Sequence, residues 1–208
     1  SAASDVYKRQ VKTTENKIKD MLVKRYNLHE LHSYVWAYND ELKAIDIPVE
    51  DNVKLANATN PNIETLRNSI VPTQLCQIKS NLSFSNDFGI FEIGRVVNGL
   101  DENGLCIENK KLAITLYSKT RNVKDIYFEL RDILAVVTDE IKHKALTFEK
   151  AEPTHSYEHP VNLNSVCLDG RNIGTIGIVH PTVNKKIDKK AAIVFAEIDV
   201  NAYANTEA

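Results

Sequence analysis

Apolar side chains recur at helical spacing in several parts of the chain. Residues 126–141 place apolar side chains on one face over about four turns, and Asn122 precedes them as an N-cap. A second helix is predicted over residues 15–26, with Thr13 or Thr14 as its cap and acidic character in its first turn. Both patterns are typical of amphipathic helices that bury one face.

A third helical pattern contains prolines. Asn60-Pro61 offers a cap followed by proline at the first helical position, and an apolar stripe from Ile63 to Ile70 follows it. Pro72 is expected to break or restart this helix, because proline lacks the amide proton that a helix interior needs. The sequence therefore predicts a helix here with an interruption near Pro72.

Alternating or β-branched segments predict the strands, which are residues 31–38, 88–97, 111–118, 145–150, 165–168, 172–179 and 193–198. The second and third are expected to pair as a hairpin. Asp169-Gly170 favours a tight turn between the fifth and sixth. Hairpins dominate and no β-α-β alternation is visible, so the predicted fold class is α+β, an antiparallel sheet flanked by helices.

Composition limits the classes of protein that fit. The chain has 208 residues, 43% hydrophobic and 26% charged, which suits one large or two small globular domains and excludes disorder as the main state. Its net charge of −2 lacks the basic excess of a dedicated nucleic-acid module, although it does not exclude a local basic patch. No apolar run approaches the roughly 20 residues that span a bilayer, and no signal peptide is visible.

Cys76, Cys106 and Cys167 lie far apart, are odd in number and form no CxxC pair. This pattern favours neither a disulfide framework nor a zinc knuckle. We expect three reduced thiols that behave as small buried hydrophobic side chains in a cytoplasmic protein.

The two ends of the chain look unlike the rest. Residues 5–10, DVYKRQ, resemble the translation of a transposon-end sequencing adapter, so residues 1–10 are predicted to be an assembly artefact. Residues 201–208 are predicted to be a truncated linker toward a missing C-terminal domain. The predicted domain is therefore 11–200, a piece of a longer protein.

The segment 155–159 matches the letters H-x-x-E-H of an inverted zinc-protease motif. That motif needs a helix so that both histidines lie on one face, and Pro153 and Pro160 disfavour one here. We therefore interpret this segment as a loop that leads into a strand. His180, which follows a strand, is read as a structural hydrogen-bond donor in preference to a catalyst.

Glu92 lies in an otherwise apolar strand. Its carboxylate is either buried and paired, with Arg67 or Arg95, or placed on a solvated face by strand alternation. Residues 174–177, GTIG, lack the Lys-Ser/Thr ending of a phosphate loop and fall inside a strand pattern. Glycine there indicates a bulge or a close backbone approach.

Several segments, read in order, resemble the C-terminal core of the phenylalanyl-tRNA synthetase β chain over nearly all of residues 13–200. They are Asn60-Pro61, the 67–72 segment RNSIVP, the 91–96 segment FEIGRV, His159-Pro160, Asp169-Gly170, the 173–177 segment IGTIG and His180-Pro181. The resemblance implies a degenerate copy of a class II synthetase catalytic module. It also implies a cytoplasmic assembly of two α and two β chains, in which the α chain carries the active site and uses ATP and Mg²⁺ to charge tRNA(Phe).

A working class II site needs two arginines to hold the phosphates of ATP. Where the first is expected, the order is Glu-Ile-Gly-Arg, ending at Arg95, and no Arg-x-Glu is present. The C-terminal strand is followed by no glycine-rich segment with an arginine. The sequence therefore assigns no catalytic, cofactor-binding or metal-ligating residue to this chain.

The predicted role is structural, with tRNA and ATP reached only through the full enzyme and no membrane involved. The candidate structural or interface residues are Asn60, Pro61, Arg67, Glu92, Gly94, His180 and Pro181. The helix over residues 15–26 is expected to join a shared helical bundle, and an exposed apolar patch is expected on the isolated chain. The alternatives are an interaction module of another system on the same fold, a free-standing ligase, or an RNA-contacting module.

Overall fold

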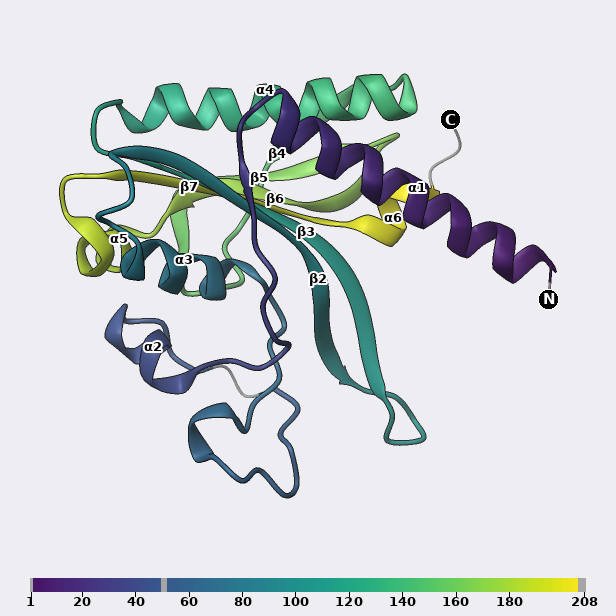
Figure 1. Cartoon of the computed structure of the whole chain (residues 1–208), viewed down its shortest axis with the longest axis horizontal. Coiled ribbons are helices and arrows are strands. Elements are labelled where there is room, and N and C mark those ends of the chain that lie inside the picture. The colour runs from purple at the N-terminus through teal and green to yellow at the C-terminus, as the bar shows by residue number, and fades with distance from the viewer. Residues whose placement is uncertain (1, 50–51, 206–208) are drawn as a thin grey trace.

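The computed structural model describes residues 2–49 and 52–205 as one α+β unit (Figure 1). Its elements are α1 (Ala2–Lys24), β1 (His29–Glu30), α2 (Asn39–Ala44), the 3₁₀ turn η1 (Pro61–Ile63), α3 (Val71–Ser80), β2 (Asp87–Leu100), β3 (Cys106–Ser118), α4 (Val123–Lys142), β4 (Leu146–Lys150), β5 (Glu158–Leu168), β6 (Arg171–Val179), α5 (Pro181–Asp188), β7 (Ala192–Asp199) and α6 (Val200–Asn205).

The sheet is mixed. Its strand order is β1-β2-β3-β7-β6-β5-β4. Every neighbouring pair is antiparallel except β1 and β2, which run parallel at one edge. The prediction of an α+β fold with flanking helices is confirmed, whereas the prediction of a wholly antiparallel sheet is wrong at this edge.

Helices cover both faces of the sheet, and each face has its own hydrophobic core (Figure 1). α1, α4 and α6 cover one face, with Ile18, Leu22 and Leu130 among the buried side chains. α2, α3 and α5 cover the other, where Leu75 and Ile187 are buried. The apolar stripe of α4 is therefore used inside the molecule.

The strongest local signals predicted their elements correctly. The side chain of Asn122 accepts a hydrogen bond from the amide of Asp125 and caps α4. β2 and β3 form the expected hairpin, which is longer than predicted and projects beyond the body of the sheet (Figure 1). Asp169 and Gly170, with φ of 51° and 72°, make the tight turn between β5 and β6.

Two predicted elements are wrong. The segment 31–38 is largely irregular, and only the single bridge from Trp36 to Leu66 gives it strand character. The segment 63–70 is not helical, because it lies extended against residues 35–37 and 53–55. The helix begins at Val71, and Pro72 occupies its first turn, where a missing amide proton costs nothing.

α1 begins earlier than the cap at Thr13 or Thr14 that the sequence suggested. The backbone is helical from Ala2 to Lys24. The turn that follows the helix reaches Asn27, which has a φ of 53°. The adapter origin of residues 1–10 and the linker role of 201–208 stay predictions, and residues 206–208 lie outside the described part of the chain.

All three cysteines are free. Cys76 and Cys167 are buried as expected, but Cys106 is exposed at the start of β3 in the projecting hairpin. Among the residues that the structure describes, no helix has the length and apolar character needed to cross a bilayer.

Candidate functional site

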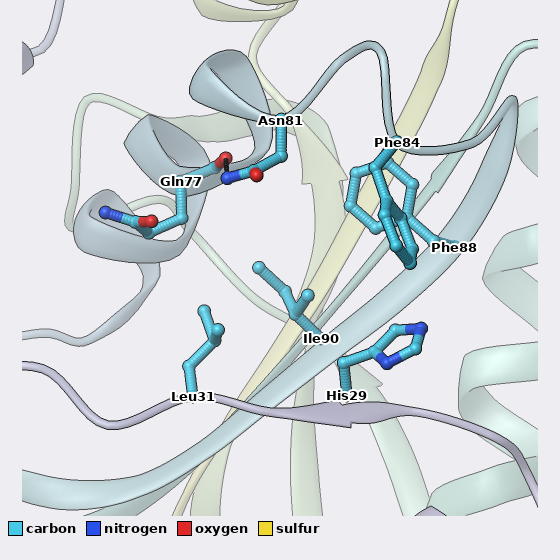
Figure 2. A pocket seen from close by; sticks show the side chains of 7 residues that line it. All are labelled: His29, Leu31, Gln77, Asn81, Phe84, Phe88 and Ile90. Atoms are coloured by element: carbon cyan, nitrogen blue, oxygen red, sulfur yellow. Dashed lines mark hydrogen bonds between the residues drawn. The ribbon is translucent and has the colours of Figure 1, made fainter.

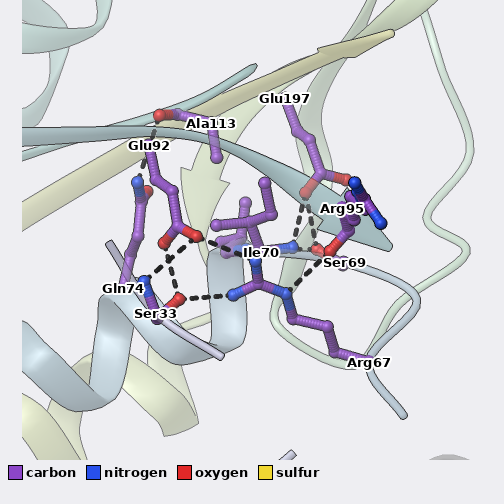
Figure 3. A network of polar contacts seen from close by, with 10 residues as sticks. Ser33, Arg67, Ser69, Ile70, Gln74, Glu92, Arg95, Ala113 and Glu197 are labelled. Atoms are coloured by element: carbon purple, nitrogen blue, oxygen red, sulfur yellow. Dashed lines mark hydrogen bonds and ion pairs between the residues drawn. The ribbon is translucent and has the colours of Figure 1, made fainter. Parts of the chain in front are cut away.

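Arg67 and Glu92 form a buried ion pair beneath α3 (Figure 3). Their Nη2 and Oε1 atoms are 2.8 Å apart, and each side chain is only 3% exposed. The Ser33 hydroxyl donates to Glu92 at 2.7 Å and accepts from Nη1 of Arg67 at 2.5 Å, while Nε of Arg67 donates to the carbonyl of Arg95 at 3.1 Å. The structure thus settles the alternatives for Glu92 in favour of burial and pairing with Arg67.

The backbone holds this pair in place. The amide of Arg67 donates to the carbonyl of Val35, and its carbonyl accepts from the amide of Val97 on β2, both at 2.8 Å. Gly94, two residues beyond Glu92 on the same strand face, lacks the side chain that would collide with the pair. The segment before α3 is therefore fixed to the edge of the sheet by backbone and side chain together.

Glu197 on β7 forms a second buried polar cluster beside the first (Figure 3). Its carboxylate accepts from the amide of Ile70 at 2.7 Å, from the hydroxyl of Ser69 at 3.0 Å and from Nζ of Lys111 at 2.8 Å. Tyr157 shares a further hydrogen bond of 2.9 Å with Ser69. Because Ile70 caps α3, the carboxylate lies at the positive end of this helix and stabilises its start.

Gln74 fastens α3 to the centre of the sheet. Its amide nitrogen donates to the carbonyl of Ala113 at 3.1 Å, and its amide oxygen accepts from the hydroxyl of Thr115 at 2.6 Å. Gln74 and Thr115 are fully buried. These hydrogen bonds therefore satisfy polar side-chain groups whose burial would otherwise destabilise the fold.

Little open space remains beside the polar network. The cavity next to the network, with Arg67, Ser69 and Thr73 in its wall, measures about 30 Å³. Ligand pockets usually measure about 300–1,000 Å³. Arg67 is fully engaged, and Arg95 points to solvent, where it pairs with Glu108 at 3.3 Å. Neither arginine is placed to hold a triphosphate, so these residues do not fit an ATP site.

The other residues singled out from the sequence lie apart from this network. Asn60 caps η1 by accepting from the amide of Asn62 at 2.9 Å, with Pro61 in the first position. His180 caps α5 through Nδ1, which accepts from the amide of Thr182, and Pro181 follows it. His180 therefore has a structural role, with Nδ1 as the acceptor, and the expectation that it also donates stays a prediction.

The H-x-x-E-H segment forms a turn and the beginning of β5, as the flanking prolines indicated. The carboxylate of Glu158 accepts from the amides of Thr154 and His155 at 2.6 and 2.9 Å. This acid is therefore engaged in closing a local turn. The described residues contain no group of three or more His, Cys, Asp or Glu side chains arranged to hold a metal ion.

Several members of the network escaped the sequence analysis. Glu197 lies in an apolar strand, as Glu92 does, so the same pattern could have singled it out. Ser33, Ser69 and Gln74 carry no such signal, because the bonds that join them to the network reach residues between 34 and 128 positions away in the chain.

An exposed apolar surface lies at the β1 edge of the sheet (Figure 2). Phe84 on this surface is 62% exposed. The ring of Phe84 packs edge-on against His29 and Phe88, with centroids 5.2 and 5.7 Å apart. Beside it opens a cavity of about 200 Å³, lined by His29, Leu31, Gln77, Asn81, Phe84, Phe88 and Ile90. Such exposed aromatic side chains are typical of a surface that another polypeptide covers.

Residues 2–200 of the chain match the model of a known family, the phenylalanyl tRNA synthetase beta chain CLM domain. The chain belongs to this family. The match extends over almost the whole seven-stranded sheet and its helices, and it agrees with the family resemblance of the sequence.

The curated relatives reported next are all beta subunits of phenylalanine–tRNA ligase. The chain is 27% identical to the phenylalanine–tRNA ligase beta subunit of Pyrococcus horikoshii over 90% of its length and 33% of that protein. The corresponding subunit of Bacillus subtilis is 27% identical over 83% of this chain, and that of Neisseria meningitidis 29% identical over 80%. The chain spans about a fifth to a third of the length of these relatives.

Proposed function

We propose that this chain is the non-catalytic structural core of a phenylalanine–tRNA ligase β chain, built as a degenerate class II synthetase module. In this proposal it packs against a catalytic α chain in a cytoplasmic assembly of two α and two β chains. The α chain uses ATP and Mg²⁺ to charge tRNA(Phe) with phenylalanine, and this chain supplies no group to that reaction.

The closed face of the sheet between β2, β3 and β7 is the observation that carries the proposal. Its acidic side chains, Glu92 and Glu197, already accept hydrogen bonds from protein groups, and Gln74 binds α3 to the sheet. A nucleotide would have to displace these contacts, which would leave buried polar groups unsatisfied. The arrangement favours a rigid scaffold over an active site.

The apolar surface at the β1 edge supports the docking of a partner chain. α1 directs its apolar residues inward, and Val23, at 45% exposed, is the large apolar side chain it presents to solvent among residues 11–24. We therefore place the centre of the interface at Phe84 and its neighbours His29 and Phe88, with the outer face of α1 at its rim. A permanent interface of this type buries about 2,000 Å² or more.

Co-expression with an α chain from the same source tests the proposal. The two chains are expected to co-purify, and Phe84→Asp is expected to abolish the complex while the variant stays folded by circular dichroism. Val161→Asp is the matched control, because Val161 is 64% exposed but lies on β5, away from this edge. Failure of the wild-type chain to retain the α chain would contradict the proposal.

A further inference from the structure

Two adjoining cavities open at the end of the molecule where α4 begins, β6 ends and α5 gives way to β7 (left side of Figure 1). They measure about 430 and 550 Å³. Both are lined by Val123, Asn162 and Ile178, so they form one continuous depression. It lies at the opposite end of the molecule from the projecting β2–β3 hairpin, and none of its lining residues belongs to the polar network or the β1 edge.

The lining of this depression is strongly basic. It contains the basic side chains Arg121, Lys124, Lys150, Lys185, Lys189 and Lys190, and no Asp or Glu among the described lining residues. The whole chain nevertheless carries a net charge of −2. Positive charge is therefore concentrated at this depression although the chain as a whole is slightly acidic. Such a positive surface raises the local concentration of an anionic partner.

Most of this charge is not neutralised within the chain. Arg121 pairs with Glu129 on α4. No ion pair within the described residues engages the five lysines of the depression, all of which are exposed. Two helix acids adjoin these lysines in the chain. Asp125 binds Asn122 at the cap of α4, and Asp188 binds Tyr117 and Lys119. Unpaired lysines around a concave surface are suited to neutralise the phosphates of a bound backbone.

Aromatic and amide groups complete the surface. Phe128 on α4 is 43% exposed and lines the first cavity. Asn162 borders both cavities. Its backbone amide donates a hydrogen bond of 3.1 Å to Nδ1 of His159. Burial and the nearby His180 lower the pKa of His159, which favours the neutral ring that can accept this bond. An exposed ring beside lysines provides a stacking platform along a charged track.

We infer that this depression binds the phosphate backbone of a single-stranded RNA segment, with Phe128 stacking on a base. The preference for RNA over an acidic protein segment rests on the exposed ring and on the proposed function, since a tRNA-charging enzyme handles RNA. The inference concerns a surface distinct from the β1 edge, so each can fail without the other.

Fluorescence anisotropy with a labelled single-stranded RNA of about 12 nucleotides, a length within the range that one domain covers, tests the inference on the purified chain. The variant Lys124→Ala/Lys150→Ala/Lys189→Ala removes three lysines that line the two cavities. The matched control Lys12→Ala/Lys17→Ala/Lys43→Ala removes the same charge from exposed positions on α1 and α2. Circular dichroism verifies that both variants are folded.

We expect the site variant to bind the RNA at least ten-fold more weakly. The slope of log affinity against log salt concentration, measured between about 50 and 200 mM, should become shallower by about two. The control is expected to change the affinity less than two-fold. Phe128→Ala is expected to weaken binding about five-fold or more with an unchanged salt slope.

An equal loss in both triple variants would overturn the inference, because the attraction would then be diffuse. Poly-glutamate that binds the chain as tightly as the RNA, through the same lysines, would assign the surface to an acidic protein segment. Retention of the α chain is measured separately, so a failure of RNA binding with an intact complex removes this inference and leaves the proposed function standing.

Discussion

Gly94 leaves free the space next to the guanidinium of Arg67. A β-carbon on Gly94 would lie 2.6 Å from Nη2 of Arg67 and 2.7 Å from Oε1 of Glu92. Both atoms belong to side chains that are almost fully buried and fixed by hydrogen bonds. They cannot move aside as an exposed side chain could, which explains why this strand carries glycine at position 94.

Gly94→Ala is therefore expected to lower the free energy of unfolding by about 1–3 kcal/mol, the usual cost of forcing extra volume into a packed site. Urea denaturation monitored by circular dichroism measures the change. In an Arg67→Ala background the same substitution should cost less, because one of the two obstructing groups is gone and Glu92 gains room to move. Equal costs in the two backgrounds would refute this explanation.

Breaking the buried pair from one side is expected to be more damaging than removing it entirely. Arg67→Met or Glu92→Met alone should each cost about 3–5 kcal/mol, because either leaves a buried charge without its partner. The double variant should cost less than either single variant. Arg95→Met serves as a control, since this exposed pair with Glu108 contributes at most about 1 kcal/mol.

The three thiols are expected to differ sharply in reactivity. Burial raises the pKa of Cys76 to about 12, so almost no thiolate is present at pH 8. Cys167 is buried as well, whereas Cys106 is exposed. Iodoacetamide at pH 8, followed by peptide mass spectrometry, should label Cys106 first and the other two only after denaturation. Labelling of Cys76 at the rate of Cys106 in the folded chain would contradict the buried position.

Asp87 is expected to make stability depend on pH in the acidic range. Hydrogen bonds from Ser118 and Thr120 hold the pKa of this carboxyl below its ordinary value. An acid with a lower pKa in the folded state stabilises the fold above its unfolded pKa of about 3.9 and loses this effect as the pH falls further. Asp87→Asn should therefore lower stability at pH 7, with a difference that shrinks below about pH 4.

Urea unfolding at pH 7 and pH 3 measures this effect. Asp20→Asn, which changes an exposed carboxylate on α1, is the control and should show a smaller difference between the two pH values. A difference for Asp87→Asn that stays constant between pH 7 and pH 3 would contradict the role assigned to its hydrogen bonds.

The parts of the fold that were predicted correctly carry local signals. α4 has a cap at Asn122 and a long apolar stripe, and the β5–β6 hairpin has Asp169-Gly170 at its turn, so neighbouring residues determine both. The segment 63–70 has apolar residues at helical spacing but is held extended by bridges such as Lys54 to Thr65. Tertiary pairing overrides local periodicity there, and the parallel pairing of β1 has no local signal at all.

The polar network was only partly predictable for the same reason. A carboxylate in an apolar strand indicated that Glu92 needs a partner, and Arg67 was one of two candidates. The bonds that complete the network join residues as distant as Ser69 and Glu197, 128 positions apart. Only the folded chain brings such groups together.

Phenylalanine-dependent exchange of pyrophosphate into ATP tests the central claim most directly, because it reports amino-acid activation itself. We predict no exchange above background for the purified chain alone and robust exchange once it is assembled with a co-expressed α chain. Exchange by the isolated chain at a rate comparable to the assembled enzyme would contradict the account, because a nucleotide would then be held on the face that α3 closes.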